Sequence, residues 1–331
     1  IYYFCIIENM KLDLKDKRLI YELDKNARQP LSKLAKKVRL SQQAVGLRLK
    51  NLVDSGVIKK FITIINTAKL GYLSYRVYVR YQNVNPEKEK EIIDSLLKNS
   101  NVFWFASLSG RWDLEVLMFA RNFFHFNQIW NAILNKHGKY IGDHTLSMAT
   151  YNYHFKRRYL VKDKEELPDA YYGGEPETIK LDKVDVQILK LLATDARIPI
   201  IDLGKKIKLA SNTVKYRIKR LEKLGIIQTY RLWLDTSKLG YELHKALITT
   251  QNLNEFKEKK IISFCKNILN TLYVIRCAGP WDIELEFEVL NNEEYRKIMM
   301  DFRNLFSDII KDYETLIIYK EHKINYFPMN V

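Results

Sequence analysis

Two short runs of polar and basic residues have the composition of a DNA-reading helix. The first holds Gln42 and Gln43, followed by Arg48 and Lys50. The second holds Ser211, Asn212, Thr213, Lys215, Tyr216, Arg217, Lys219 and Arg220. Amide side chains suit the edge of adenine, and Lys or Arg suits guanine or phosphate. These types and spacings predict two surfaces for double-stranded DNA. The alternative is that the basic residues only form a solvated helix face.

The charge of the chain supports the DNA interpretation. The 331 residues carry a formal net charge of +16. Residues 10–65 hold 14 Lys or Arg against 5 Asp or Glu, and residues 180–235 hold 13 against 6. The charges outside these windows balance. Because a charge needed only for solubility would be spread evenly, two basic windows indicate two surfaces for a polyanion.

The two windows belong to an internal repeat with an offset of 169 residues. Residues 12–72 and 181–241 align without a gap and share 22 identities in 61 positions. This unit is too long for a solenoid repeat, so each copy is predicted to contain a pair of domains. Residues 157–179 between the copies contain Pro and a Gly-Gly pair, which favour a linker.

The basic half of each copy has the pattern of a winged helix-turn-helix. Apolar residues at helical spacing over 13–25 precede a break at Pro30 and a short helix at 31–38. A third helix begins after Ser41, a typical N-cap, whereas the second copy has Ala210 there and is expected to use Ser211. The third helix of this fold enters the major groove. Since the two third helices differ at nearly every exposed position, one chain would read two unlike half-sites.

A strand is predicted after the third helix. Residues 57–65 are rich in β-branched residues, which is typical of a wing strand. We expect Lys59 and Lys60 on this wing to contact DNA.

The neutral half of each copy has the pattern βαββαβ, a ferredoxin-like sandwich. The fold class is therefore α+β, with two tandem copies of a winged helix-turn-helix domain followed by a ferredoxin-like domain. The predicted boundaries are 10–66, 70–156, a linker at 157–179, then 180–235 and 239–331.

These motifs resemble the Lrp/AsnC (feast/famine) family of transcriptional regulators, in a tandem duplicated form. The resemblance rests on Ala-Arg-x-Pro at 27–30 and 196–199, Leu-Gly-Tyr at 70–72 and 239–241, and a Gly-x-Trp-Asp turn in each copy. It implies RAM-type α/β domains, a sequence-specific regulator, homo-oligomeric assembly and a small effector, often an amino acid. The motif carries the effector site to Gly110, Asp113, Gly279 and Asp282. The alternative is a structural hairpin at these turns.

One strand face suggests how the two copies pair. Asp282, Glu284, Glu286 and Glu288 share a face by alternation. We hypothesise that this face packs on Arg76 and Arg80 of the first copy within the chain, forming a pseudo-dimer. The alternative is a solvated acidic edge.

Other classes of function are weakly supported by the residues. Three cysteines fit neither a disulfide framework nor a zinc site, which favours packing roles and a cytoplasmic protein without cofactor or metal. No apolar run reaches the length of a membrane span, and residues 1–9 are interpreted as an upstream extension or a wrongly assigned start. No catalytic constellation is found, so no enzymatic activity is expected. The alternatives are a tetrapyrrole decarboxylase of the same fold and a non-specific, chromatin-like DNA binder.

Overall fold

A computed structural model describes residues 12–162 and 170–328. The proposed upstream extension at 1–9, Cys5 and the charged run at 163–166 lie outside the described residues.

The first copy follows the predicted order of elements. Its helix-turn-helix comprises α1 (Leu14–Lys25), α2 (Leu31–Val38) and α3 (Gln42–Asp54), followed by β1 (Ile58–Ile65) and the short helix η1 (Thr67–Lys69). Its α/β domain comprises β2 (Leu73–Tyr81), α4 (Pro86–Lys98), β3 (Val102–Ser109), β4 (Leu114–Ala120), α5 (Phe123–His137), η2 (Gly138–Tyr140) and β5 (Ile141–His154).

Two elements lie in the segment that was predicted to be a linker. They are the short helix η3 (Arg158–Leu160) and the strand β6 (Ala170–Gly173), which pairs with β5. The Gly-Gly pair at its end does not prevent the strand from forming, because Gly173 has a φ of +113° and lies against the carbonyl of Thr150, where a Cβ would clash.

The second copy repeats the first. Its helix-turn-helix comprises α6 (Lys183–Thr194), α7 (Ile200–Ile207) and α8 (Ser211–Lys223), followed by β7 (Ile227–Leu234) and η4 (Thr236–Leu239). Its α/β domain comprises β8 (Glu242–Thr250), α9 (Glu255–Asn267), β9 (Thr271–Ala278), β10 (Ile283–Val289), α10 (Asn292–Leu305) and β11 (Ile310–Ile324).

The two α/β domains share one closed sheet. The strand order is β2-β4-β3-β11-β8-β10-β9-β5, and β5 also pairs with β2, so eight antiparallel strands form a barrel. The copies join at β3–β11 and at β9–β5. Strand residues alternate between the two faces. Val77 and Val79 face the core under α4 and α5, whereas Arg76 and Tyr78 lie on the other face, inside the barrel.

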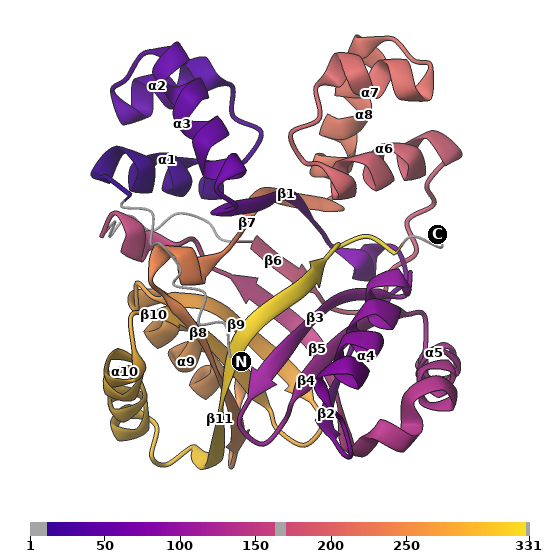
Figure 1. The fold of residues 1–331 in the computed structure, drawn as a ribbon, viewed down its shortest axis with the longest axis vertical. Coiled ribbons are helices and arrows are strands. Elements are labelled where there is room, and N and C mark those ends of the chain that lie inside the picture. The colour runs from indigo at the N-terminus through magenta and orange to yellow at the C-terminus, as the bar shows by residue number, and fades with distance from the viewer. Residues whose placement is uncertain (1–11, 163–169, 329–331) are drawn as a thin grey trace.

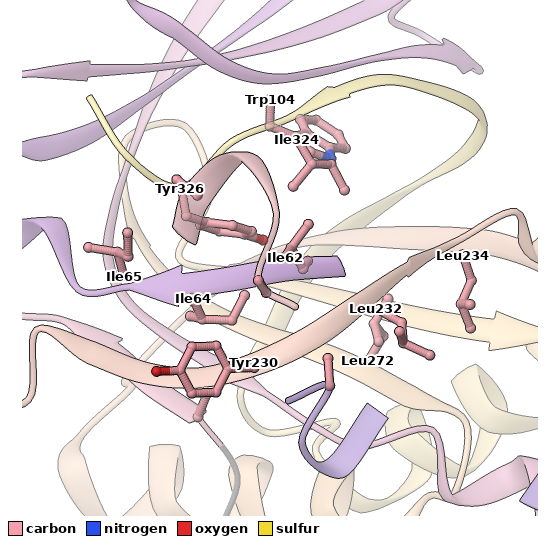
Figure 2. Close-up of a cluster of buried hydrophobic side chains, with 14 of the residues drawn as sticks. Ile62, Ile64, Ile65, Trp104, Tyr230, Leu232, Leu234, Leu272, Ile324 and Tyr326 are labelled. Carbon is pink, nitrogen blue, oxygen red and sulfur yellow. The ribbon is translucent and has the colours of Figure 1, made fainter. Parts of the chain in front are cut away.

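The helix-turn-helix lobes are joined by a separate two-stranded sheet. β1 pairs antiparallel with β7, and Thr63 lies opposite Tyr230. Figure 1 shows this ribbon between the two lobes and the barrel, with α1–α3 on the side of α9 and α10. Each lobe therefore stands over the α/β domain of the other copy. Figure 2 shows Ile62, Ile64 and Ile65 of β1 with Tyr230 and Leu232 of β7 in the core that joins the lobes to the barrel.

Two further findings concern the cysteines and the helices of the described residues. Cys265 and Cys277 are free and buried, as expected of packing residues. No helix among the described residues is long and apolar enough to cross a membrane.

Candidate nucleic-acid interface and barrel interior

The two third helices present most of the predicted DNA-contacting residues to solvent. In α3, Val45 and Leu52 are buried while Gln42, Gln43 and Lys50 are exposed. In α8, Val214 and Leu221 are buried. The exposed residues of α8 are Ser211, Asn212, Thr213, Lys215, Tyr216, Lys219 and Arg220. Tyr216 is 69% exposed, which is high for a large ring. Both helices thus offer a polar outer face to a partner.

The predicted arginine contacts are partly occupied within each lobe. In the first copy, Arg48 Nη1 lies 2.8 Å from Asp13 Oδ2 and 2.7 Å from Asp16 Oδ1. In the second copy, Arg217 makes the same two ion pairs with Asp182 and Asp185. Since the contact recurs in both copies, these arginines tie the third helix to the first.

Arg220 is also engaged. Its Nη1 lies 2.8 Å from Asp185 Oδ2. Among the described residues, the lysines of these helices without an ion-pair partner, and so available to phosphate, are Lys50, Lys215, Lys219 and Lys223.

Lys59 and Lys60 lie on β1, whose partner is β7 of the other copy rather than a strand of its own lobe. Lys59 Nζ is 3.5 Å from Asp235 Oδ2 and 5.5 Å from the ring centre of Trp233. Burial lowers the pKa of Lys60. β1 therefore joins the two lobes. Lys59 and Lys60 lie beside this joint rather than on an open wing.

The four residues of the predicted effector site lie where the copies meet. A Cβ on Gly110 would approach Leu316 Cδ2 to 2.8 Å, and one on Gly279 would approach the carbonyl oxygen of Leu146 to 2.9 Å. Asp113 Oδ2 accepts a hydrogen bond from Tyr81 N at 2.8 Å. The glycine of each turn thus lies against residues of the other copy.

The second aspartate has the same arrangement. Asp282 Oδ2 accepts from Thr250 N and Thr250 Oγ1, both at 2.7 Å. Each aspartate therefore satisfies the backbone at the end of a neighbouring strand.

A cluster of buried charges joins the copies inside the barrel. Arg76 Nη1 lies 2.7 Å from Glu284 Oε2 and 3.3 Å from Glu115 Oε1. In return, Lys245 Nζ lies 2.5 Å from Glu115 Oε2. The hypothesis that the acidic strand face packs on Arg76 is confirmed. For Arg80 it is wrong, because this side chain is exposed at the end of β2.

The cluster contains more carboxylates than cations. Lys245 is also paired with Glu284 at 3.2 Å and with Glu286 at 3.1 Å. Burial raises the pKa of Glu115 and of Glu286. Burial also opposes ionisation of Glu284, but Arg76 and Lys245 outweigh it and hold its pKa at about 2. Three carboxylates thus share two cations.

A second buried network of charges is not repeated at the 169 offset. Arg157, from the segment after β5, binds Glu288 and Asp24 at 2.9 Å each, and Arg231 Nη2 binds Asp24 at 2.9 Å. At the 169 offset, Ala193 and Phe119 replace Asp24 and Glu288. The network therefore anchors the first lobe, on α1, to the second α/β domain.

A cavity opens at one end of the barrel under β1 and β6. It encloses about 730 Å³ of space free of protein atoms, part of it open to solvent. Its walls include Phe103, Trp104, Tyr172 and Tyr326, and its polar lining includes Arg76, Asn152, Glu286 and Glu321. None of these was assigned to a ligand site from the sequence. The one sign of this site in the sequence was a difference between the copies. At the 169 offset, the acidic residues Glu321 and Glu286 correspond to the uncharged Asn152 and Leu117.

Within residues 12–162 and 170–328, no three His, Cys, Asp or Glu side chains are grouped as the ligands of a metal ion would be.

Comparison with known proteins agrees with the interpretation of the exposed third helices as DNA-binding elements. A model of winged helix-turn-helix DNA-binding domains matches residues 12–59 and again residues 181–228. The fold and the match together define a DNA-binding protein with two winged helix-turn-helix domains. LrpC of Bacillus subtilis is 32% identical over 126 residues, which are 38% of this chain and 83% of LrpC. An uncharacterised HTH-type transcriptional regulator of Pyrococcus furiosus is 42% identical over 122 residues, 37% of this chain and 80% of that protein. The chain belongs to the Lrp/AsnC family of transcriptional regulators, in a form about twice their length.

A likeness over nearly the full length corrects one expectation. The crystal structure of the siroheme decarboxylase NirDL matches with a TM-score of 0.60 and 13% identity, covering 95% of this chain and 94% of that one. A second structure of this enzyme, in co-complex with an iron-uroporphyrin III analogue, matches with a TM-score of 0.61. At this identity the likeness shows the fold alone. The expectation of no enzymatic activity is nevertheless overturned, because an enzyme has this same two-copy architecture.

Proposed function

We propose that this protein is a sequence-specific transcriptional regulator whose two helix-turn-helix lobes read unlike half-sites of one operator. The observation that carries the proposal is the contrast between matched buried positions and mostly unmatched exposed positions in α3 and α8. Val45 corresponds to the buried Val214, whereas the exposed Gln43 corresponds to Asn212. Because bases are read by the exposed side chains, the operator should be asymmetric.

The proposal is tested by fluorescence anisotropy with DNA from upstream of the protein's own gene and with a scrambled duplex. Specific sites typically bind ~10³-fold or more tighter than non-specific DNA. We expect such a ratio for the upstream duplex, and inverting one half of the site should reduce it. Equal affinity for both duplexes would instead support a non-specific, chromatin-like binder.

Two variants separate base reading from phosphate binding. Asn212→Ala should reduce the preference for the upstream duplex. Lys219→Ala should weaken binding to both duplexes alike and reduce the slope of log K against log salt by ~0.9. Lys98→Ala, an exposed lysine at the end of α4, is the matched control and should change neither.

An amino-acid effector at the Gly-x-Trp-Asp turns stays a prediction. Titrating pooled amino acids into the same assay tests it. A shift in DNA affinity that Asp282→Asn abolishes, with the fold retained, would support the site at this turn. A shift that survives this substitution would place the effector elsewhere.

A tetrapyrrole decarboxylase is the second candidate, and the barrel-end cavity with its buried Arg76 is the observation that favours it. Binding of an iron-uroporphyrin III analogue would change the visible absorption spectrum of the tetrapyrrole. We rank this candidate second because the carboxylates Glu286 and Glu321 in the lining repel a polycarboxylate.

A further inference from the structure

The barrel-end cavity is built from both copies. Ser74 and Trp104 come from the first copy, and Ile275 and Glu286 come from the second. β6 covers it, and the carbonyl and amide of Gly173 are both joined to the Asn66 side chain, at 3.5 and 3.1 Å. The cover is thus tied to the end of β1, the strand that joins the two DNA-binding lobes.

The walls of the cavity favour an aromatic ligand. The rings of Phe103, Trp104, Tyr172 and Tyr273 contribute to these walls. Burying an aromatic ring between such walls is favourable, and ring faces and edges attract one another.

The charge of the lining favours a cation. Glu321 accepts hydrogen bonds from Trp104 Nε1 at 2.7 Å and Trp233 Nε1 at 3.1 Å. No cation among the described residues lies within ion-pair distance of it. Glu286 competes with two other carboxylates for Lys245. Burial raises the pKa of Glu321 and of Glu286, so a cation beside these carboxyl groups would favour their charged forms.

One buried donor also lacks a partner. The side chain of Arg76 is 95% buried and lines the cavity, and its Nε has no acceptor in the described part of the chain. A buried N–H is costly without a partner, and a ring face or an acceptor atom of a ligand would satisfy it.

The equivalent site in the second copy shows which groups can be held at this place in the fold. Tyr72 and Phe119 lie beside the cavity, and their counterparts are Tyr241 and Glu288. In the second copy the Tyr159 ring packs at a tilt against Tyr241, with ring centres 4.4 Å apart, and its hydroxyl donates to Glu288 at 2.6 Å, while Arg157 pairs with the same carboxylate. A ring and a cation from the chain itself thus occupy the second site.

We propose that the barrel-end cavity of the first copy binds a small aromatic amine, with its ring between Trp104 and Tyr172 and its ammonium group on Glu321 and Glu286. At the 169 offset, Tyr326 and Pro328 replace Arg157 and Tyr159, so neither of these positions holds a cation, and the amine supplies one. This inference goes beyond DNA binding and does not depend on it, because the ligand is detected directly.

The experiment is isothermal titration calorimetry of the full chain with three matched indoles: tryptamine, tryptophan and indole-3-acetate. We expect tryptamine to bind at least tenfold more tightly than indole-3-acetate, because only the amine supplies the missing charge. Glu321→Gln and Glu286→Gln should each weaken tryptamine about tenfold, since a charge-assisted contact becomes a neutral one. Glu293→Gln, on the exposed face of α10, should leave binding unchanged.

The ranking of the three ligands by the unmodified chain keeps the test valid if a variant does not fold. Tighter binding of indole-3-acetate, equal binding of all three, or binding of none would overturn the proposal. Tighter binding of an iron-uroporphyrin III analogue than of tryptamine would also overturn it, in favour of a polycarboxylate site. Loss of operator binding with tryptamine binding retained would overturn only the proposed function.

Discussion

A buried histidine and a half-buried one are held in the neutral form by their surroundings. His154 stacks on Tyr273 at 4.2 Å, and burial together with Arg231 and Arg157 lowers its pKa well below the ordinary value. His322 stacks on Phe105 at 5.1 Å and shares a hydrogen bond of 2.8 Å with Ser107 Oγ. Burial lowers the pKa of His322 to about 4. Folding therefore opposes protonation at both positions.

The stability of the fold should depend on His322 in acid. The unfolded imidazole has a pKa of ~6.5, above the folded value, so its contribution is complete above pH ~6.5 and is lost as the pH falls toward 4. His322→Gln can keep the bond to Ser107 but does not titrate. Its free energy of unfolding should fall less between pH 6.5 and 4 than that of the unmodified protein, as measured by urea denaturation. Parallel curves for the two proteins would contradict this assignment.

At the scale of elements, the two third helices differ in their caps. The Ser41 side chain accepts a hydrogen bond from Ala44 N at 3.1 Å at the start of α3. α8 has Ala210 at the same position and no side-chain cap, and Ser211 is its first helical residue rather than its cap. The expectation that Ser211 caps α8 is therefore wrong.

Exchanging the caps should have opposite effects in the two lobes. An N-cap serine contributes ~1 kcal/mol relative to alanine. Ser41→Ala should destabilise the first lobe by about this amount, and Ala210→Ser should stabilise the second by a similar amount. Amide hydrogen exchange along α3 and α8 resolves the two lobes. Equal protection of α8 with and without Ala210→Ser would show that another group already satisfies its first turn.

At the scale of the whole molecule, reciprocal contacts hold the copies together. Arg28 Nη1 donates to the carbonyl oxygens of Ala196 and Ile198, and Arg197 Nη1 donates to those of Ala27 and Gln29. The barrel adds the strand pairs β3–β11 and β5–β9 and the buried ion pairs between them. These contacts join the two copies within one chain as the two subunits of a dimer would be joined.

Reversing one buried charge should open this intrachain dimer. Arg76→Glu places a further carboxylate beside Glu115 and Glu284, and breaking a buried ion pair costs ~3–5 kcal/mol. We expect a lower melting temperature and a larger radius or mass by light scattering. Arg80→Glu on the same strand is the control, since its side chain is exposed and should tolerate the change. Equal melting and mass for both variants would show that the buried cluster does not hold the barrel closed.

The sequence by itself determined the repeat, the order of elements and the outer faces of the third helices. These features depend on signals a few residues apart. Asp13 caps α1, Pro30 precedes α2 and Ser41 caps α3, all close to the predicted positions. Exposure of Gln42 and Gln43 follows from the helical period of the apolar residues around them.

Tertiary structure alone decided the partners of the strands and of the charges. β1 was predicted as a wing, but its unpaired edge is met by β7, 169 residues away. β6 forms next to a Gly-Gly pair, with Gly173 as its last residue, because β5 offers it an edge. The cavity exists because Glu321 and Trp104, far apart in the chain, meet where β3 joins β11. An alternating pattern states which face of a strand is apolar but not which strand lies beside it, and burial of a charge depends on what that neighbour brings.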